Sequence, residues 1–425
     1  MADGQVKEIW IGAVCVAATA AMGFLLVVLF VRYFFHPFRR DVLALCPPES
    51  RGRKQKSQDA KGVLAFVGPA FAVSRLFVFV SGILILMLCR GTGDLFTPWI
   101  RWDAAHYVRL ARDWYVSQGD ARFHLVFFPL YPMLIRGLHL LTGMDCAPAG
   151  VLLSNACLFG AAWALYRLTE LGYGQPCARD AVLLLLFSPF GFFFSLPFSE
   201  SLFLMLSLAS ALCARKRRFV PAVLLGALCA ATRLLGLLSA VPIFYEGLKR
   251  TGEKKGGLKM AIIFFLGTLP VTLGFASYLY LNHRVSGHPL TFLTYQKEHW
   301  FQQMGSLPNT LRYTLENALN ARDPWLRLGT WIPQALFILL TIALLLSLFR
   351  RVDPGDGAYA LLYIYLAVSP TWLLSGCRYL TALYPLTPML GLRFPGRRAQ
   401  AVLLGLGVLG GLVMLYLYLV PSCVM

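Results

Sequence analysis

The sequence predicts an all-α polytopic membrane protein, a bundle of about 10–12 transmembrane helices with short paired or broken helices and a helical loop on the outer face. Composition is the first reason, because 58% of the 425 residues are hydrophobic and only 14% are charged. The second is that several apolar runs reach the roughly 20 residues that a helix needs to cross a bilayer. These runs are continuous rather than alternating, which favours helices over a closed barrel.

Complete spans are expected wherever such a run is uninterrupted. They are residues 9–31, 63–89, 149–170, 259–281, 329–349, 358–375 and 400–420, with a shorter one at 379–392. The first run follows Glu8 and has no small-residue cleavage site, so we expect a retained span rather than a signal peptide. We therefore divide the chain into an N-terminal span with its basic loop, residues 1–62, and a main transmembrane domain, residues 63–425.

The net charge of +19 does not indicate a nucleic-acid partner. Lysine and arginine gather in short segments between the apolar runs, as in cytoplasmic loops under the positive-inside rule. The ten cysteines form no CxxC pair and the seven histidines are dispersed, so no metal-site spacing is present. The sequence implies no firm cofactor, although it leaves room for a divalent cation.

The basic segments also set the expected topology. By the positive-inside rule the cytoplasmic segments are residues 32–62, 215–218, 249–259, 350–351 and 393–398. The stretch PWIRWDAAHYVRLARDWY, residues 98–115, then lies outside, and so does a long loop at 282–328. Residues 125–142 are expected to form an interfacial helix.

Two intervals between cytoplasmic points are interrupted. Residues 180–215 are broken by FSPFGFFFSLPFSES, and residues 219–248 are broken around ATRLLG. Each interval must cross out and back, so each predicts a pair of short helices. Irregular backbone at membrane depth is tolerated only where it is buried in protein or lines a wet cavity, so the breaks indicate a site.

Ionisable and polar residues in these breaks and outer segments are the candidates for that site, because such groups are costly near lipid and usually face a cavity. They are Asp103, His106, Ser199, Glu200, Arg233, Arg378, Tyr379, Glu298 and His299. Structural alternatives stay open for several of them. Asp103 could cap an interfacial amphipathic helix, Glu200 could complement a helix dipole, Arg233 could snorkel and Arg378 could anchor a span at the interface.

An outer cavity with carboxylates and arginines suits sugar transfer from a lipid-linked phosphate to a hydroxyl. Arginine binds phosphate bidentately and stays charged, while a carboxylate can accept the proton of the attacking hydroxyl. A lipid-linked sugar flippase or transporter would need the phosphate site but no base. A non-catalytic membrane subunit of a glycosylation complex is the third alternative.

Five motifs occur in the order found in PIG-V-type mannosyltransferases, which are multi-pass enzymes of the GT-C class. They are RWDAAHY, FFPLYPMLIR, SPFGFFFSLPFSESLF, ATRLLG and CRYLTALYP, and the resemblance spans residues 70–392. The stretches LLSNACLFGAAWALYRLTEL and NHRVSGHPLTFLTYQKEHW resemble bacterial members more than the eukaryotic enzyme that adds the second mannose of the glycosylphosphatidylinositol anchor. The chain departs from the eukaryotic motif at Leu234 and Leu235, and by its extra N-terminal span.

The resemblance implies a GT-C-type bundle that inverts the anomeric carbon on the luminal or periplasmic side. The donor would be polyprenyl- or dolichyl-phosphate mannose, and the acceptor a hydroxyl of a lipid-linked or envelope glycan. The resemblance favours a location in the bacterial cytoplasmic membrane. For a eukaryotic member the expected location is the endoplasmic reticulum membrane.

Each candidate residue then receives an expected role. Asp103 would be the base, and Arg233 and Arg378 would bind the donor phosphate with help from Arg101 or Arg109. Substrate would also contact a further group of residues, which comprises Trp102, His106, Tyr107, Ser199, Glu200 and Tyr379.

Overall fold

The computed structural model describes residues 2–35, 58–253 and 257–424, which form a helical bundle without a β-strand. Six helices in these ranges are long and apolar enough to cross a membrane, which confirms a multi-pass membrane protein. They coincide with six predicted spans. These are α1 (Ala2–Phe35), α2 (Ala60–Arg90), α5 (Cys146–Tyr173), α10 with α11 (Gly257–Thr268 and Thr272–Ser286, joined by η5, Leu269–Val271), α14 with η6 and α15 (Pro324–Leu326, Arg327–Trp331 and Ile332–Leu348), and α19 (Arg397–Leu419).

Both interrupted intervals are pairs of short helices, as predicted. Helices α6 (Gln175–Leu186) and α7 (Glu200–Arg215) flank the first break, which contains the 3₁₀ turn η3 (Gly191–Ser195). Helices α8 (Phe219–Ala230) and α9 (Ala240–Glu253) flank the second, with the turn η4 (Leu234–Ser239) between them. Pro189 and Pro197 lack a backbone N–H, so the first break cannot continue as a helix.

The second break is tightened by Gly236. A Cβ atom at this position would lie 2.2 Å from the carbonyl oxygen of Cys229, so only glycine lets the turn fold back onto α8. The fold-back brings Arg233, at the start of the turn, against the body of the bundle. The break therefore positions a side chain as well as ending a helix.

Several predicted bounds need correction. The span expected at 358–375 is α16 (Pro354–Ala367), and it ends early because the chain beyond it pairs with the outer loop, where Gly305 N donates to Ser369 O at 3.0 Å. The single helix expected at 125–142 is instead η2 (Asp120–Val126) followed by α4 (Leu130–Thr142), with a bend of 113° between them. The short span expected at 379–392 is α17 (Gly376–Thr381) and α18 (Leu386–Arg393). The outer loop contains α12 (Thr291–Glu298) and α13 (Leu307–Asn320).

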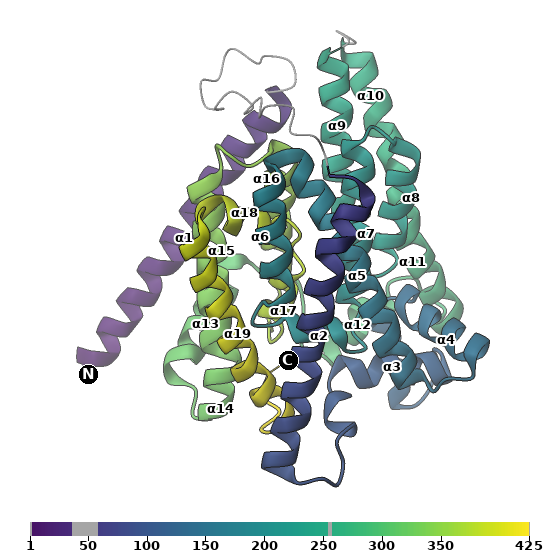
Figure 1. The fold of residues 1–425 in the computed structure, drawn as a ribbon, viewed down its shortest axis with the longest axis vertical. Coiled ribbons are helices and arrows are strands. Elements are labelled where there is room, and N and C mark those ends of the chain that lie inside the picture. Colours follow the sequence, from purple (N-terminus) through teal and green to yellow (C-terminus); the bar gives the residue numbers. More distant parts are fainter. Residues whose placement is uncertain (1, 36–57, 254–256, 425) are drawn as a thin grey trace.

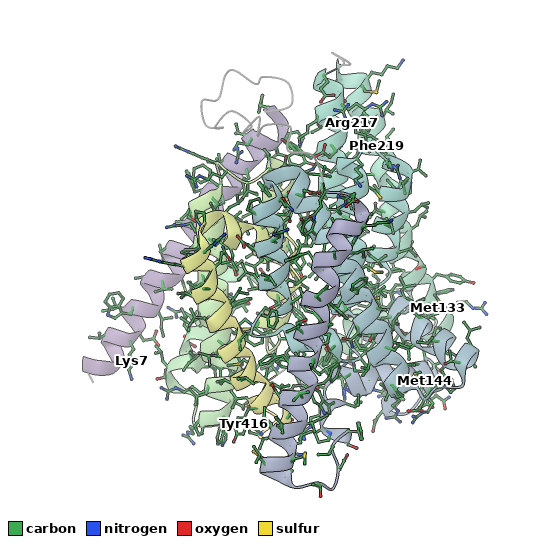
Figure 2. All side chains as sticks on the ribbon, in the orientation of Figure 1. Lys7, Met133, Met144, Arg217, Phe219 and Tyr416 are labelled. Carbon is green, nitrogen blue, oxygen red and sulfur yellow. The ribbon has the colours of Figure 1, made fainter. Side chains whose placement is uncertain are left out.

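Figure 1 shows α2, α5, α6 and α7 running side by side through the bundle. Helix α4 and helix α3 (Asp103–Asp113), which follows the turn η1 (Thr97–Trp99), lie at one end, here called the α3–α4 end. The opposite end, here called the α9–α10 end, carries the last turn of α9, the first turn of α10 and Arg217, a member of a predicted cytoplasmic segment (Figures 1 and 2). Most of the predicted basic loop at 32–62 and part of 249–259 lie outside the described residues, and the sidedness of the protein stays a prediction.

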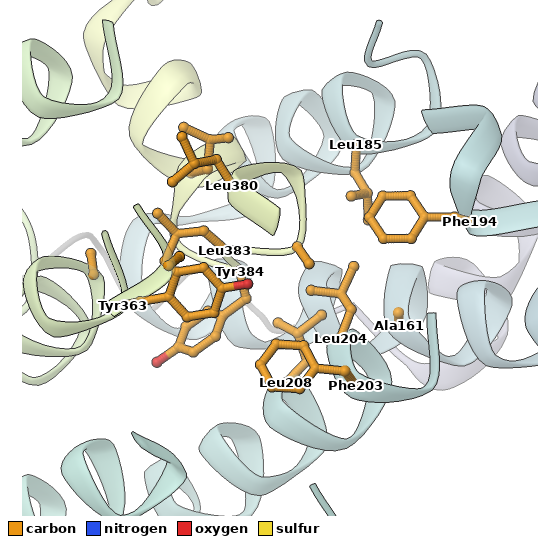
Figure 3. Packing of buried hydrophobic residues seen from close by; sticks show 14 of the residues in the cluster. Ala161, Leu185, Phe194, Phe203, Leu204, Leu208, Tyr363, Leu380, Leu383 and Tyr384 are labelled. Atoms are coloured by element: carbon orange, nitrogen blue, oxygen red, sulfur yellow. The ribbon is translucent and has the colours of Figure 1, made fainter. Parts of the chain in front are cut away.

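The core lies where α7 meets α5 and the segment from α16 to α17. Figure 3 shows Phe203 and Leu204 of α7 close to Ala161 of α5, with Tyr363 and Leu380 packed from the other side. Small residues such as Ala161 let helices approach closely in a membrane. The Tyr363 hydroxyl also donates to the carbonyl of Tyr379 at 2.8 Å, which ties α17 to this core.

Helix α1 is part of the bundle and not a detached anchor. It runs obliquely along one flank (Figure 1) and packs against α13, α15 and α16. Helix α2 begins at Ala60, so the predicted domain boundary after residue 62 falls inside its first turns. The division at that residue stays a prediction.

Candidate active site

Four charged side chains from four segments meet at the α3–α4 end. Asp103 begins α3, Glu200 begins α7, Arg233 precedes η4 and Arg378 lies in α17. Arg378 Nη2 donates to Asp103 Oδ2 at 2.5 Å, and Arg378 Nε lies 3.0 Å from Glu200 Oε1. The same Glu200 oxygen accepts a hydrogen bond from Arg233. The structure thus joins Asp103, Arg378, Glu200 and Arg233 in one ion-pair chain.

The backbone around Trp102 and Asp103 places Asp103 within the ion-pair chain. Trp102, just before it, has φ = 53°, a left-handed conformation that is costly for a residue with a large side chain. Asp103 is the first helical residue, and the helix cap at Trp102 has no side-chain hydrogen bond. The alternative role of Asp103 as a helix cap is therefore wrong. On the same helix Tyr107 and Leu110 are buried, so α3 is held against the bundle through this face.

The ion-pair chain is deeply placed. The Glu200 and Arg378 side chains are 1% and 2% exposed, whereas those of Arg233 and Asp103 are 18% and 29% exposed. Arg378 also lies over the ring of Phe198 at 4.7 Å, and Arg233 over the ring of Tyr379 at 4.6 Å. Among the described residues, Arg378 Nη1 and Glu200 Oε2 have no hydrogen-bond partner. Buried charges in such numbers are costly and are retained where they do chemistry or binding.

Electrostatics at Asp103 favour its ionised form. Burial opposes ionisation, but the attraction of Arg378 and its hydrogen bond outweigh burial, and the pKa of the Asp103 carboxyl lies below its ordinary value. Burial likewise lowers the pKa of His106 below about 6.5. At neutral pH the site therefore presents a carboxylate beside a neutral imidazole.

A cavity of about 410 Å³ opens above the ion-pair chain. Asp103, Arg233 and Arg378 form its charged wall. Its aromatic lining comprises Trp102, Tyr107, Phe127, Phe128, Trp300, Trp372 and Tyr379, and its neutral polar lining includes Thr232, Gln296 and Gln302. Aromatic faces with a few polar groups are typical of a small-molecule site.

Some predicted site residues lie behind or beside this cavity rather than in its wall. Glu200 lies beneath the two arginines, and the buried Ser199 hydroxyl accepts from Tyr107 at 2.9 Å and from Arg233 at 3.4 Å. Neither residue lines the cavity, and both contact side chains that do, so their substrate-binding roles stay predictions. His106 packs edge-on against Trp300 with ring centroids 5.2 Å apart, and its Nδ1 is 2.9 Å from His124 Nε2.

Other candidates are directed elsewhere. Arg101 donates to the Tyr418 carbonyl at 3.2 Å, and Arg109 forms an exposed pair with Asp113 at 3.7 Å. Glu298 is exposed, and His299 stacks on Phe123 at 4.1 Å. None of the four lines the cavity. Throughout the described ranges, no group of three or more His, Cys, Asp or Glu side chains is arranged to hold a metal ion.

Two curated proteins that match this chain are both GPI mannosyltransferases 2. GPI mannosyltransferase 2 of Schizosaccharomyces pombe is 27% identical to this chain over 309 residues, which cover 67% of this chain and 61% of the relative. GPI mannosyltransferase 2 of Chaetomium globosum is 34% identical over 119 residues, 25% of each chain. This chain is thus similar to GPI mannosyltransferase 2, in agreement with its resemblance to PIG-V-type proteins. No family model matches it.

The matched region spans only about three fifths of the fission-yeast GPI mannosyltransferase 2. Among solved structures, the archaeal oligosaccharyltransferase AglB from Archaeoglobus fulgidus, in complex with an inhibitory peptide and a dolichol-phosphate, is 12% identical. Its TM-score is 0.42, over 84% of this chain and 56% of that chain. No statement about the site of this protein rests on that similarity.

Sequence reasoning missed the part of the cavity built by the outer loop and the segment after α16. Trp300 and Gln302 come from the first, and Trp372 from the second. Hydrogen bonds hold the two together, with Thr371 N donating to Gln303 O at 2.9 Å and Gln302 Nε2 donating to Trp372 O at 2.8 Å. The aromatic ring at Trp300, beside the predicted His299, was the one available signal.

Proposed function

We propose that this protein transfers a mannosyl group from a polyprenyl- or dolichyl-phosphate sugar to a hydroxyl of a lipid-linked or envelope glycan. The observation that carries the proposal is a carboxylate and two arginines on one wall of an aromatic-lined cavity. The similarity to GPI mannosyltransferase 2 supports the sugar and the reaction class. Transfer on the non-cytosolic face, and the membrane concerned, stay predictions of the charge pattern and the resemblance.

In the proposed mechanism, Asp103 is the base and the arginines receive the leaving group. The acceptor oxygen forms a bond to the anomeric carbon while the bond from that carbon to the phosphate oxygen breaks, and the acceptor proton passes to Asp103. The lipid phosphate leaves as an anion stabilised by Arg233 and Arg378, so no separate acid is needed. One displacement inverts the anomeric configuration and requires no covalent intermediate.

The ion pair between Asp103 and Arg378 controls whether the Asp103 carboxylate is free to accept a proton. Oδ2 of Asp103 accepts a hydrogen bond from Arg378. A donor phosphate would share Arg378 with Asp103 and so loosen the ion pair. The carboxylate then becomes more basic when the donor is bound, which suits a general base.

Substitution of Asp103 by asparagine tests the proposal. We expect Asp103→Asn to lower transfer by on the order of 100- to 10,000-fold, because the amide cannot accept the proton. The measurement is mass spectrometry of product formed by purified protein from polyprenyl-phosphate mannose and a panel of lipid and peptide acceptors. Asp113→Asn is the matched control, since Asp113 ends the same helix and is exposed.

Unimpaired turnover by Asp103→Asn would remove the base assignment. The flippase alternative predicts a different result with the unmodified protein. It would move the sugar lipid across liposomes without forming a glycosidic bond.

A further inference from the structure

A second hollow of about 330 Å³ lies on the flank of the bundle formed by α1, between that helix and α9, α10 and α16. Its walls are apolar side chains apart from the hydroxyls of Tyr33 and Thr268. Both hydroxyls are already used, since Tyr33 donates to Val241 O at 2.6 Å and Thr268 to Phe265 O at 2.7 Å. The walls therefore offer no hydrogen bond, and a hydrocarbon is the occupant that fits.

The hollow and the cavity share α16 as a wall, and the adjoining segments η4 and α9 line one each. On α16, Leu366 lines the cavity and Leu362 lines the hollow. Residues four apart lie on the same face of a helix, about one turn from each other. On the opposite wall, Leu235 of η4 lines the cavity, and Val241, just beyond this turn, lines the hollow.

Helix α1 supplies a fixed wall to this hollow. Leu29 is 1% exposed and packs so closely on α16 that a Cβ atom at Gly357 would lie 3.0 Å from it. Arg32 Nη2 donates to the carbonyls of Arg350 and Val352 at 3.3 and 3.2 Å, which fastens α1 next to the start of α16. On the open side, Phe30 of α1 is 57% exposed. One side is thus closed by packing and the other faces the lipid.

We propose that this hollow, with α1 as one wall, holds the hydrocarbon chain of the lipid-phosphate substrate while its phosphate lies against Arg233 and Arg378. The inference rests on the proposed function and extends it by assigning a substrate-binding role to the first helix. The chain would leave the cavity past Leu366 and follow α16 toward the α9–α10 end. Affinity should then depend on chain length, because a longer chain makes more van der Waals contacts with the fixed walls of the hollow than with mobile lipid tails.

Binding of undecaprenyl phosphate and of citronellyl phosphate to the full-length protein in nanodiscs tests this assignment. We expect the unmodified protein to bind the long-chain lipid more tightly. Leu362→Trp fills the hollow and should weaken undecaprenyl phosphate binding by on the order of tenfold, with citronellyl phosphate unchanged. Leu340→Trp makes the same change at an exposed position of α15 outside both hollows and should have no effect.

A second variant tests the same assignment if Leu362→Trp does not fold. Phe30→Ala removes an exposed part of the wall and should weaken long-chain binding selectively, without opening the buried core. Equal binding of the two phosphates, or equal weakening of both by either variant, would overturn the assignment. These are binding measurements, so they do not depend on sugar transfer. Chain-length selectivity without sugar transfer would reject the proposed reaction and would still support the assignment of the hollow to the hydrocarbon chain.

Discussion

Arg233 and Arg378 converge on one carboxylate oxygen of the buried Glu200, which holds two positive charges close together at the cavity wall. Such a pair is suited to a phosphate, whose oxygens accept bidentate hydrogen bonds from guanidinium groups. We expect Arg233→Ala to weaken binding of undecaprenyl phosphate by on the order of tenfold, and to weaken binding of phosphate-free undecaprenol much less. Equilibrium binding to the purified protein measures both affinities.

The control for this change is Arg109→Ala, which removes an exposed arginine of α3 that does not line the cavity. It should leave both affinities unchanged. If Arg233→Ala weakened the phosphate and the alcohol equally, the role of Arg233 would be packing against Tyr379 rather than phosphate binding.

The lowered pKa of Asp103 makes a prediction about pH. A carboxyl with a depressed pKa stays ionised until the pH falls through that lowered value, and His106, whose pKa is also lowered, is neutral above about 6.5. The acid limb of kcat/KM should therefore lie below about pH 4, with no inflection between about pH 5 and 8. Initial rates across this range, with product measured by mass spectrometry, check it. An inflection near pH 6.5 that disappears in His106→Gln would assign the essential titration to the imidazole instead.

At the residue scale, the sequence was informative about the charged wall and about the aromatic residues next to it in sequence, and silent about the part of the wall built by distant segments. Asp103, Arg233 and Arg378 could be found because an ionised side chain near an apolar run is costly and needs a reason. Trp300 and Trp372 carry no such signal, since aromatic residues are ordinary at a membrane interface. Arg101 and Arg109 were expected beside Asp103 because they are close in sequence, but Arg101 precedes α3 and bonds to the Tyr418 carbonyl, and Arg109 lies on an exposed face of that helix.

Among the elements, the segment between α6 and α7 depends on a helix far away in sequence. Arg75, buried within α2, donates to Leu186 O at 2.9 Å, to Gly191 O at 3.2 Å and to Ser195 Oγ at 2.6 Å. It thereby satisfies backbone carbonyls that the broken helix leaves without partners. The segment ends at Ser199 and Glu200, so Arg75 supports the ion-pair chain from behind.

Arg75→Met should therefore destabilise the protein by roughly 3 kcal/mol, because buried carbonyls lose their donor. The melting temperature of purified protein in detergent measures the loss, and hydrogen exchange should rise within residues 187–199. Arg90→Met is the control on the same helix, since Arg90 makes one exposed hydrogen bond to Val420 O. A uniform rise in exchange along α2, with 187–199 unchanged, would contradict this role.

Element prediction succeeded where a single apolar run decides the structure and failed where tertiary pairing does. The six long spans follow from hydropathy alone, and the two breaks follow from proline, glycine and isolated charges. The early end of α16 does not, because residues 369–371 pair with the outer loop across 60 to 68 positions of sequence. Neither segment has a hydrophobic periodicity that would predict that contact.

Across the whole molecule, α7 connects two ion-pair clusters at opposite ends of the bundle. Its first residue, Glu200, belongs to the candidate active site, and its last, Arg215, contacts three carboxylates near the α9–α10 end. Arg215 lies 2.9 Å from Glu246 of α9, 3.1 Å from Asp356 of α16 and 3.4 Å from Asp353, the cap of α16. Lys249 adds contacts to Glu246 at 3.0 Å and to Asp353 at 2.9 Å. The cluster therefore ties three helices together through one arginine whose side chain is 16% exposed.

Arg215→Met would leave these carboxylates with Lys249 as the nearest cation, and breaking a buried pair on one side costs on the order of 3–5 kcal/mol. We expect a clear fall in the melting temperature of the full-length protein in detergent. Arg217→Met is the matched control two residues away, because Arg217 pairs with Glu253 at the surface and such pairs contribute at most about 1 kcal/mol. Equal effects of the two changes would show that the cluster at the α9–α10 end does not hold α7, α9 and α16 together, and that the position of Glu200 is set by its own end of the helix.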